Sequence, residues 1–344
     1  VAVAPGNNNC SVDHLPGTAS KITIQNGGQL TVEAGAPTLT IATVATGEVA
    51  LSIEAGGMLN ALGNIGISNG ITGAGGQGIS VDNSGKITNE GTINITRTDD
   101  DEPALLNRDS LINHGTINIT RGSVGLLSES SAALDNLEGA AININNCLRA
   151  VDLFHNVNNY GSFNVSGGNV GFSTLEGFGN KTTGRISVSG TTGTGFMASS
   201  SVGFVNEGDI LLGVNAAIAD TALVLGDGGM LNTVTGTTVV GSGTKGMVLL
   251  QSSFTNNGLL SIDNTVNEAI EITPTGGLFA FDNRVEIGIN TPTGGGILNN
   301  GNLRISSLGT LSVQTTASVG LQVNDRCRNS GDLCTYQDFV GSVD

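Results

Sequence analysis

The sequence predicts an all-β protein: a single parallel β-helix solenoid of about 24 residues per coil, where a coil is one turn of the solenoid. Three observations lead to this prediction. The stretch "NEGTINIT" begins at Asn89 and its near-copy "NHGTINIT" begins 24 residues later at Asn113. Apolar and polar residues alternate in short runs, and no segment shows a long helical period.

Weaker copies of the repeated unit continue along the chain. The shared core is Asn-x-Gly-x-Φ-x-Φ, where Φ is apolar, and further copies begin at Asn136, Asn159, Asn180, Asn206, Asn232, Asn256, Asn283 and Asn299. A second motif, a small residue followed by apolar residues as in Gly125-Leu126, lies between them. The interval predicts about 11–13 coils, each too small to bury its inner face alone.

The strands are expected where alternation is strictest, as in residues 93–96, 117–120, 142–145, 163–166 and 186–189. Their apolar members are mainly Ile, Val, Leu and Phe, which suit a pleated sheet with one buried face. Gly, Asn, Asp, Ser and Thr separate them and indicate tight corners. Each coil therefore contains two or three short strands and no helix.

The asparagine of the repeat has two possible roles. Asn and Gly both tolerate the left-handed backbone of a sharp corner, so the asparagine could turn the chain and face water. Asparagines at one position of successive coils can instead stack into a ladder of hydrogen-bonded amides. We expect such a structural ladder from Asn89, Asn113, Asn136, Asn159, Asn206, Asn256 and Asn299.

Composition narrows the functional classes. The net charge is −16 and only 13 Lys and Arg occur, so no basic patch for nucleic acid can be assembled. The chain is rich in Gly, Asn, Ser and Thr, and charged residues make up 12%. No apolar run is long enough for a transmembrane helix. These features are typical of a secreted, extracellular or cell-surface protein.

The four cysteines suggest different roles. Cys327 and Cys334 are close in sequence, and a disulfide between them is expected in an extracellular protein. Cys147 is expected to be a buried thiol, because Cys10 lies several coils away if the N-terminus stays at its own end. Cys10 itself could be free, paired between molecules, or brought to Cys147 by a long excursion.

One dense acidic run, Asp99, Asp100, Asp101 and Glu102, is a weak calcium candidate, since hard cations bind clustered carboxylates. It lacks EF-hand spacing. Arg97 and Arg121 occupy equivalent positions of neighbouring coils, so a solvated loop with surface ion pairs is the alternative. No other cofactor is expected.

No motif supports catalysis. Gly73–Gly78 fits G-x-G-x-x-G but lacks the helix of a dinucleotide site, and a glycine corner is expected. Ser68 in "GISNG" lacks a nucleophile-elbow context, so a turn serine is expected. Arg149, Asp152 and His155 are a thin cluster for a polysaccharide-active enzyme. Threonines do not recur regularly enough for ice binding. We therefore expect a non-enzyme.

The units "LINHGTINIT", "FVNEGDILL", "FTNNGLLSI" and "ILNNGNLRI" resemble coils of bacterial surface β-helix proteins, including autotransporter passengers and filamentous-haemagglutinin-type adhesins. The resemblance covers about residues 20–325. It implies a secreted, right-handed β-helix, a handedness that parallel crossovers also favour. It is specific for the fold and leaves the function open.

The ends suggest how such a solenoid is used. Residues 1–20 are expected to form an N-terminal extension or assembly strand, 21–325 the β-helix, and 326–344 a C-terminal cap or docking segment. Val1, Ala2, Val3 and Ala4, with Tyr336 and Phe339, are the assembly candidates. We favour a structural subunit that associates end to end into a homopolymeric surface fibre. The alternative is a monomeric adhesin or stalk that binds surface glycans.

Overall fold

The computed structural model is a parallel β-solenoid made entirely of strands and turns in its described part. It describes residues 2–3, 9–12, 17–43, 47–69, 78–155, 157–199, 203–280, 286–290, 296–299, 302–305, 310–314 and 321–323. The chain forms two compact units, Val1–Phe172 and Ser173–Asp344. The predicted fold class is confirmed, and the repeat of about 24 residues is one coil.

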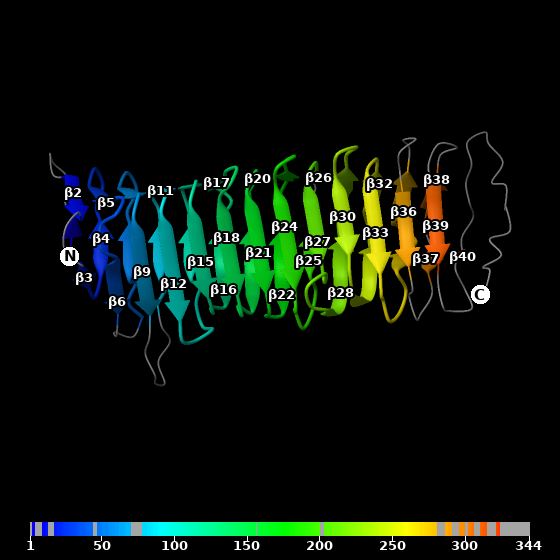
Figure 1. Ribbon diagram of the computed structural model, residues 1–344, viewed down its shortest axis with the longest axis horizontal. Helices are drawn as coiled ribbons and strands as arrows, with labels where there is room; N and C mark the ends of the chain where they lie inside the picture. Colours follow the sequence, from blue (N-terminus) through cyan, green and yellow to red (C-terminus); the bar gives the residue numbers. More distant parts are fainter. Residues whose placement is uncertain are drawn as a thin grey trace. The chain divides into compact units, whose positions relative to one another are not determined.

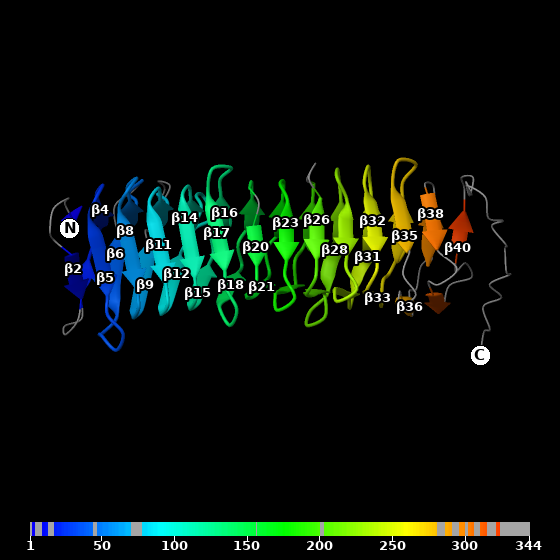
Figure 2. The same ribbon diagram turned by 90° about the horizontal axis from the view of Figure 1, so that it is seen from above.

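In the first unit each described coil gives one strand to each of three parallel sheets, A, B and C (Figures 1 and 2). In order, sheet A holds β1 (Ala2–Val3), β4 (Ile22–Ile24), β7 (Leu51–Ile53), β10 (Val81–Asn83), β13 (Leu105–Asn107), β16 (Val124–Ser128) and β19 (Arg149–Leu153). Sheet B holds β2 (Asn9–Val12), β5 (Gln29–Val32), β8 (Met58–Ala61), β11 (Lys86–Asn89), β14 (Ser110–Asn113), β17 (Ala133–Asn136) and β20 (Val157–Asn159). Sheet C holds β3 (Thr18–Ala19), β6 (Leu39–Thr43), β9 (Asn64–Asn69), β12 (Thr92–Arg97), β15 (Thr116–Thr120), β18 (Ala141–Asn145) and β21 (Ser162–Ser166).

The second unit repeats this order, and β22 (Val170–Thr174) spans the boundary in sequence. Sheet A here holds β25 (Phe196–Ala198), β28 (Ile218–Leu225), β31 (Gly243–Leu249), β34 (Ile270–Ile272), β37 (Ile297–Asn299) and β40 (Leu321–Val323). Sheet B holds β23 (Phe178–Asn180), β26 (Phe204–Asn206), β29 (Met230–Asn232), β32 (Ser253–Asn256), β35 (Gly277–Ala280) and β38 (Asn302–Ile305). Sheet C holds β24 (Arg185–Ser189), β27 (Asp209–Leu212), β30 (Thr237–Val240), β33 (Leu259–Asp263), β36 (Glu286–Asn290) and β39 (Thr310–Gln314).

The core is built from apolar residues that stack on their equivalents in the next coil. Ile93 of β12 is paired in register with Ile117, which is paired with Ile142 and then Phe163. All four side chains are buried. Because alternate residues of a strand face opposite sides, the residues between them face outward and form regular columns on the surface.

The glycine of the repeat has a different role from the one expected. Neither Asn113 nor Gly115 is among the described residues with a positive φ, so a left-handed backbone does not explain the motif. A Cβ atom added to Gly115 would lie 2.1 Å from the carbonyl oxygen of Gly91, its equivalent in the preceding coil. The motif needs glycine because successive corners stack backbone against backbone.

The described part of residues 1–20 lies in the solenoid. Strands β1, β2 and β3 pair in parallel with β4, β5 and β6, so they form the first coil of all three sheets. Val3 is buried. The other assembly candidates Val1, Ala4, Tyr336 and Phe339, and the expected Cys327–Cys334 disulfide, lie outside the described residues.

Among the described residues there is no helical segment with the length and hydrophobicity of a membrane span.

Candidate functional site

The structure places the repeat asparagines of the first unit in a buried ladder, where each is the last residue of a sheet-B strand. The Nδ2 atom of Asn89 donates to Oδ1 of Asn113 at 2.7 Å, Asn113 to Asn136 at 2.9 Å, and Asn136 to Asn159 at 2.8 Å. All four side chains are fully buried. The ladder begins at Asn89 because its partner in the preceding coil is Ala61.

A second run occupies the same strand position in the second unit. Asn180 donates to Asn206 at 2.8 Å, Asn206 to Asn232 at 2.7 Å, and Asn232 to Asn256 at 2.7 Å. Our expected ladder omitted Asn180 and Asn232, although both begin degenerate copies of the repeat. The run stops at Asn256 because β35 places Ala280 beside it.

The expectation for Asn299 is wrong. Asn299 ends β37 in sheet A, in register with Ile272, whereas the ladder belongs to sheet B. The Asn-x-Gly motif also occurs at the corner from sheet A to sheet B, as in Asn83-Ser84-Gly85. There a shorter ladder forms: Asn83 donates to Asn107 at 2.8 Å, and Asn107 donates to the Ser128 hydroxyl at 3.0 Å.

The residues considered above for catalysis make contacts within the fold. Arg149 donates to Asp152 at 2.7 Å, and Asp152 is buried. His155 is also buried, and its Nε2 lies 2.6 Å from the hydroxyl of Ser128, where the shorter ladder ends. Ser68, expected in a turn, lies instead within strand β9, because it continues the alternation of Ile65 and Ile67. Of the glycine motif at 73–78, only Gly78 lies within the described residues.

The acidic run is organised by a buried arginine. Arg97 was expected to form a surface ion pair, but its side chain is fully buried at the corner from sheet C to sheet A. It donates to Asp99 at 2.7 Å and to the carbonyl oxygen of Gly78 at 2.7 Å. Arg121, the equivalent residue of the next coil, has a positive φ and is exposed, 3.9 Å from Asp100.

The remaining two carboxylates of this loop, Asp101 and Glu102, are exposed. Within the described residues no three His, Cys, Asp or Glu side chains are placed to hold a metal ion together. Calcium binding by Asp99, Asp100, Asp101 and Glu102 thus has no preformed geometry in this structure.

The two described cysteines differ sharply. Cys147 is a buried free thiol, as expected, and Cys10 is an exposed free thiol in β2. Burial, reinforced by the negative charge of Asp100, raises the pKa of Cys147 to about 12. Cys147 is therefore an unreactive part of the core at physiological pH.

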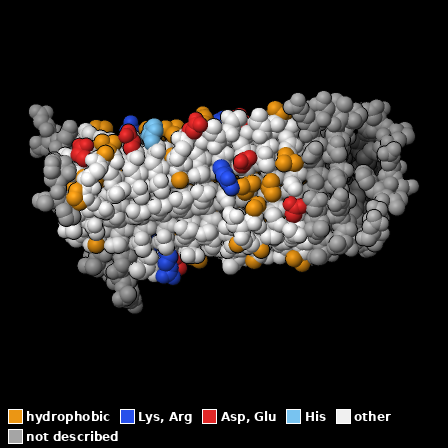
Figure 3. All heavy atoms as spheres, in the orientation of Figure 1, with side chains coloured by type: hydrophobic (Ala, Val, Ile, Leu, Met, Phe, Trp, Pro, Cys, Tyr) orange, Lys and Arg blue, Asp and Glu red, His pale blue; other side chains and the backbone are white. Residues whose placement is uncertain are grey.

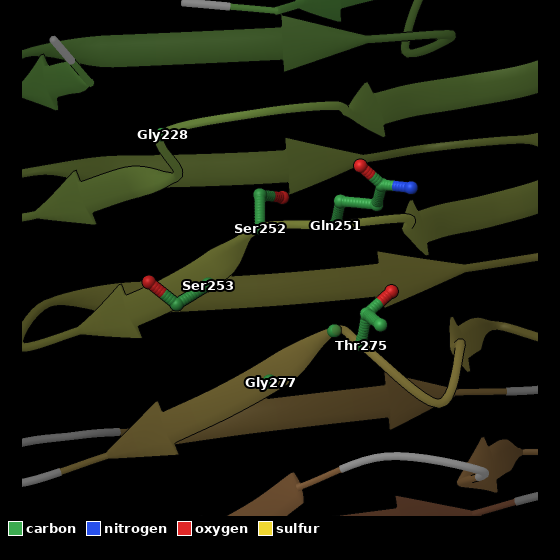
Figure 4. Close-up of a pocket in the computed structure, with 7 residues that line it drawn as sticks. Gly228, Gln251, Ser252, Ser253, Thr275 and Gly277 are labelled. Carbon is green, nitrogen blue, oxygen red and sulfur yellow. The ribbon is translucent and has the colours of Figure 1, made fainter. Parts of the chain in front are cut away.

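A shallow groove with both polar and apolar lining lies along the corners between sheets A and B in the second unit (Figure 4). It consists of two adjoining hollows of about 300 and about 540 Å³, which share Gln251 and Thr275. The lining comes from successive corners that follow β25, β28, β31 and β34: Ser199, Gly226, Asp227, Gly228, Leu250, Gln251, Ser252, Ser253, Thr273, Pro274, Thr275, Gly276 and Gly277.

The groove has few charges, and three of its hydroxyl groups are already hydrogen-bonded. Asp227 is the single charged side chain of this described lining. Ser252, Thr273 and Thr275 are held by hydrogen bonds to the carbonyl oxygens of the sheet-A strand ends, for example Thr275 to Leu250 at 2.9 Å. Gln251 is exposed, and its amide has no hydrogen-bond partner among the described residues. Sequence reasoning missed this groove because its residues are ordinary turn residues.

Sheet C of the first unit carries a third ladder, on the outside. Asn118 donates to Asn94, Asn143 to Asn118, and Asn164 to Asn143, each at 2.8 Å. We call these four residues the outer column. Thr92 and Thr96 beside it align with Thr116 and Thr120 in the next coil. On the face shown in Figure 3, described charged side chains are few among uncharged atoms.

Comparison with known proteins leaves the family open. No protein-family model matches this chain, and no curated protein matches it significantly. The chain is similar to the crystal structure of a TibC-catalysed, hyper-glycosylated fragment of TibA, residues 55–350, with 15% sequence identity and a TM-score of 0.29. The match covers 90% of this chain and 97% of that one. A likeness at this identity and TM-score does not identify the family or the function of this chain.

Proposed function

We propose that this protein is an extracellular, non-enzymatic β-solenoid that binds neutral glycans in the groove between sheets A and B of the second unit. The observation that carries the proposal is the uncharged polar part of the groove's lining: hydroxyl side chains follow β25, β31 and β34, and the Gln251 amide has no hydrogen-bond partner among the described residues. An oligosaccharide presents hydroxyl groups at regular intervals. Coils repeat at about 4.8 Å, so neighbouring corners can meet hydroxyls of the same or adjacent sugar rings.

The groove offers both kinds of contact that a sugar needs. Gln251 can donate and accept, and the Asp227 carboxylate can accept from two hydroxyl groups. Leu250 is 41% exposed and lies with Pro274 in the larger hollow, where it provides an apolar surface for the C–H face of a ring. The absence of Lys and Arg from this described lining favours neutral over acidic sugars.

Glycan-array screening followed by calorimetry tests this function. We expect binding to neutral oligosaccharides that Gln251→Ala weakens by about tenfold, or about 1.4 kcal/mol. Ser131→Ala is the matched control, because Ser131 is an exposed residue at a sheet A–B corner of the first unit. Failure to bind any neutral oligosaccharide, or equal effects of the two substitutions, would overturn the proposal.

End-to-end association into a fibre is the second candidate, favoured by the first coil. Among the described strands β2 pairs only with β5, and it carries the exposed Cys10. A strand with one free edge can pair with another copy of the chain. Electron microscopy of the purified protein should then show filaments; single particles under every condition would contradict it. Loss of filaments with reductant or in Cys10→Ser would indicate a disulfide link, and loss with chelator would indicate calcium.

A further inference from the structure

The outer column contains a repeated modification motif. Asn94-Ile95-Thr96, Asn118-Ile119-Thr120 and Asn164-Val165-Ser166 each match Asn-x-Ser/Thr, the acceptor motif for N-linked glycosylation. The register places their asparagines at one strand position, with Asn143 between the second and third. Three copies of one motif in one geometry allow their surroundings to be compared directly.

The surroundings differ at the amide nitrogen, the atom that accepts a sugar. Nδ2 of Asn118 donates to Asn94, and Nδ2 of Asn164 donates to Asn143, both at 2.8 Å. Asn94 begins the column: its Oδ1 accepts a hydrogen bond, but its Nδ2 has no acceptor among the described residues. Asn94 and the Thr96 hydroxyl-bearing side chain are both exposed, whereas Asn118 and Asn164 are half-buried.

The neighbouring coil also leaves room beside Asn94. Its partner in β9 is Gly66, which has no side chain. A Cβ atom added to Gly66 would meet its nearest neighbour, a methyl group of Thr38, at 3.6 Å. Asn118, in contrast, stands between Asn94 and Asn143, and coils only about 4.8 Å apart leave no width for a sugar ring between two amides.

We propose that Asn94 is the N-glycosylation acceptor of this face in the folded protein, and that Thr96 is the hydroxyl residue of its recognition motif. The donor is a glycosyl diphosphate. The bond from the sugar's C1 to the phosphate oxygen breaks, and the diphosphate leaves with the bonding electron pair. Nδ2 of Asn94 forms the new bond to C1 and loses one proton to a base of the transferase. No oxidant or reductant is required.

The remaining amide group keeps its place in the structure after modification. The Oδ1 atom of Asn94 still accepts the hydrogen bond from Asn118, so the outer column is preserved. A glycan here would stand on sheet C of the first unit, whereas the proposed binding groove lies at the A–B corner of the second unit. The two proposals therefore fail or succeed separately.

Mass spectrometry of the protein purified from its natural source tests the inference. We expect a glycan on the peptide that contains Asn94, and unmodified peptides for Asn118 and Asn164. A single monosaccharide would indicate a nucleotide-sugar donor, and a preassembled oligosaccharide a lipid-linked donor. An unmodified Asn94 would overturn the proposal. Equal modification of all three asparagines would also overturn it, since modification before folding would then ignore the geometry.

Variants produced in the same source separate the motif from general exposure. Asn94→Gln and Thr96→Ala should lose the glycan, whereas Thr96→Ser should retain it. Asn118→Gln is the matched control, from the same motif one coil further along, and should leave the glycan in place. Unchanged circular dichroism in all four variants would show that the losses are not caused by unfolding. A glycan that persists in Thr96→Ala would contradict the assigned motif.

Discussion

Asn113 shows how a single side chain can join three coils. It accepts from Asn89 at 2.7 Å and donates to Asn136 at 2.9 Å, with no access to water. In Asn113→Ala the donor of Asn89 and the acceptor of Asn136 both lose their partners in the buried ladder. Leaving such groups unpaired costs about 1–3 kcal/mol each, so we expect urea unfolding to report a loss of about 2–6 kcal/mol.

The outer column supplies the control for the Asn113→Ala substitution. Asn118 lies in the next strand of the same coil and also makes one amide hydrogen bond to each neighbouring coil, donating to Asn94 and accepting from Asn143, but it is half exposed. Water can replace its partners, so Asn118→Ala should change stability by no more than about 0.5 kcal/mol. Equal losses in the two variants would show that burial does not determine the strength of these ladders.

The buried thiol of Cys147 should make the free energy of unfolding depend on pH. Its pKa rises from the ordinary value of 9.0 to about 12 because the thiolate would lose hydration in the core. The folded chain therefore keeps the proton that the unfolded chain releases above pH 9. The resulting stability is fully present below pH 9 and is lost as the pH rises toward about 12.

Two measurements check this prediction. The stability difference between the natural protein and Cys147→Ala should shrink between pH 9 and pH 12. Iodoacetamide at pH 8, followed by peptide mapping, should label Cys10 and leave Cys147 unlabelled. Rapid labelling of Cys147 in the folded protein would contradict both its burial and its raised pKa.

Among the structural elements, the strands could be predicted from the sequence, but the order of the corners between them could not. Strands were predictable because Ile93-Asn94-Ile95-Thr96 alternates strictly, and alternation is a direct consequence of pleated geometry. Corners were harder: Asn-x-Gly precedes sheet C at Asn113 but sheet B at Asn83. Asn299 was misplaced for this reason. The motif identifies a corner with close stacking but not which of the corners it is.

The burial of the charged side chain of Arg97 could also not be predicted from the sequence. A lone arginine at the end of a strand looked like a surface residue, because burial of a guanidinium requires partners from distant positions. Those partners are the carbonyl oxygens of Gly78 and Pro103 and the carboxylate of Asp99. None of these contacts can be read from spacing alone.

Asp99 is therefore expected to be structural. Asp99→Asn removes the one carboxylate that pairs with the buried Arg97, and Asp99 is itself only 25% exposed. We expect a loss of about 2 kcal/mol in thermal or urea unfolding, the usual contribution of a hydrogen bond to a charged group. Asp101→Asn, at an exposed position of the same loop, should have almost no effect. If calcium raises the melting temperature and Asp101→Asn abolishes that rise, the loop is a metal site instead.

For the chain as a whole, the repeat length, strand content and parallel pairing could be predicted from the sequence, because every coil must bury its apolar inner face against its neighbours. The groove could not. Its residues belong to corners separated by more than 20 positions in sequence, and most are the Ser, Thr and Gly that turns commonly contain. Only the stacking of coils brings such residues together, so spacing along the chain does not reveal the groove.

Because the coils stack in a single row, a substitution in one coil should destabilise mainly that coil and its neighbours. In a solenoid each coil contacts mainly its neighbours, so stability is roughly a sum of nearest-neighbour terms. Ile117→Ala deletes a buried side chain that stacks between Ile93 and Ile142 and should cost about 2–5 kcal/mol. Hydrogen exchange should rise in β12, β15 and β18, with the second unit unchanged.

Leu260→Ala provides the mirror experiment in the second unit, because Leu260 is a fully buried residue of the same sheet. Its effect should centre on β30, β33 and β36 and spare the first unit. Exchange measured by mass spectrometry on both variants would separate the two patterns. An equal rise throughout both units, in either variant, would mean that the coils unfold as one cooperative body, and the nearest-neighbour description would then be wrong for this chain.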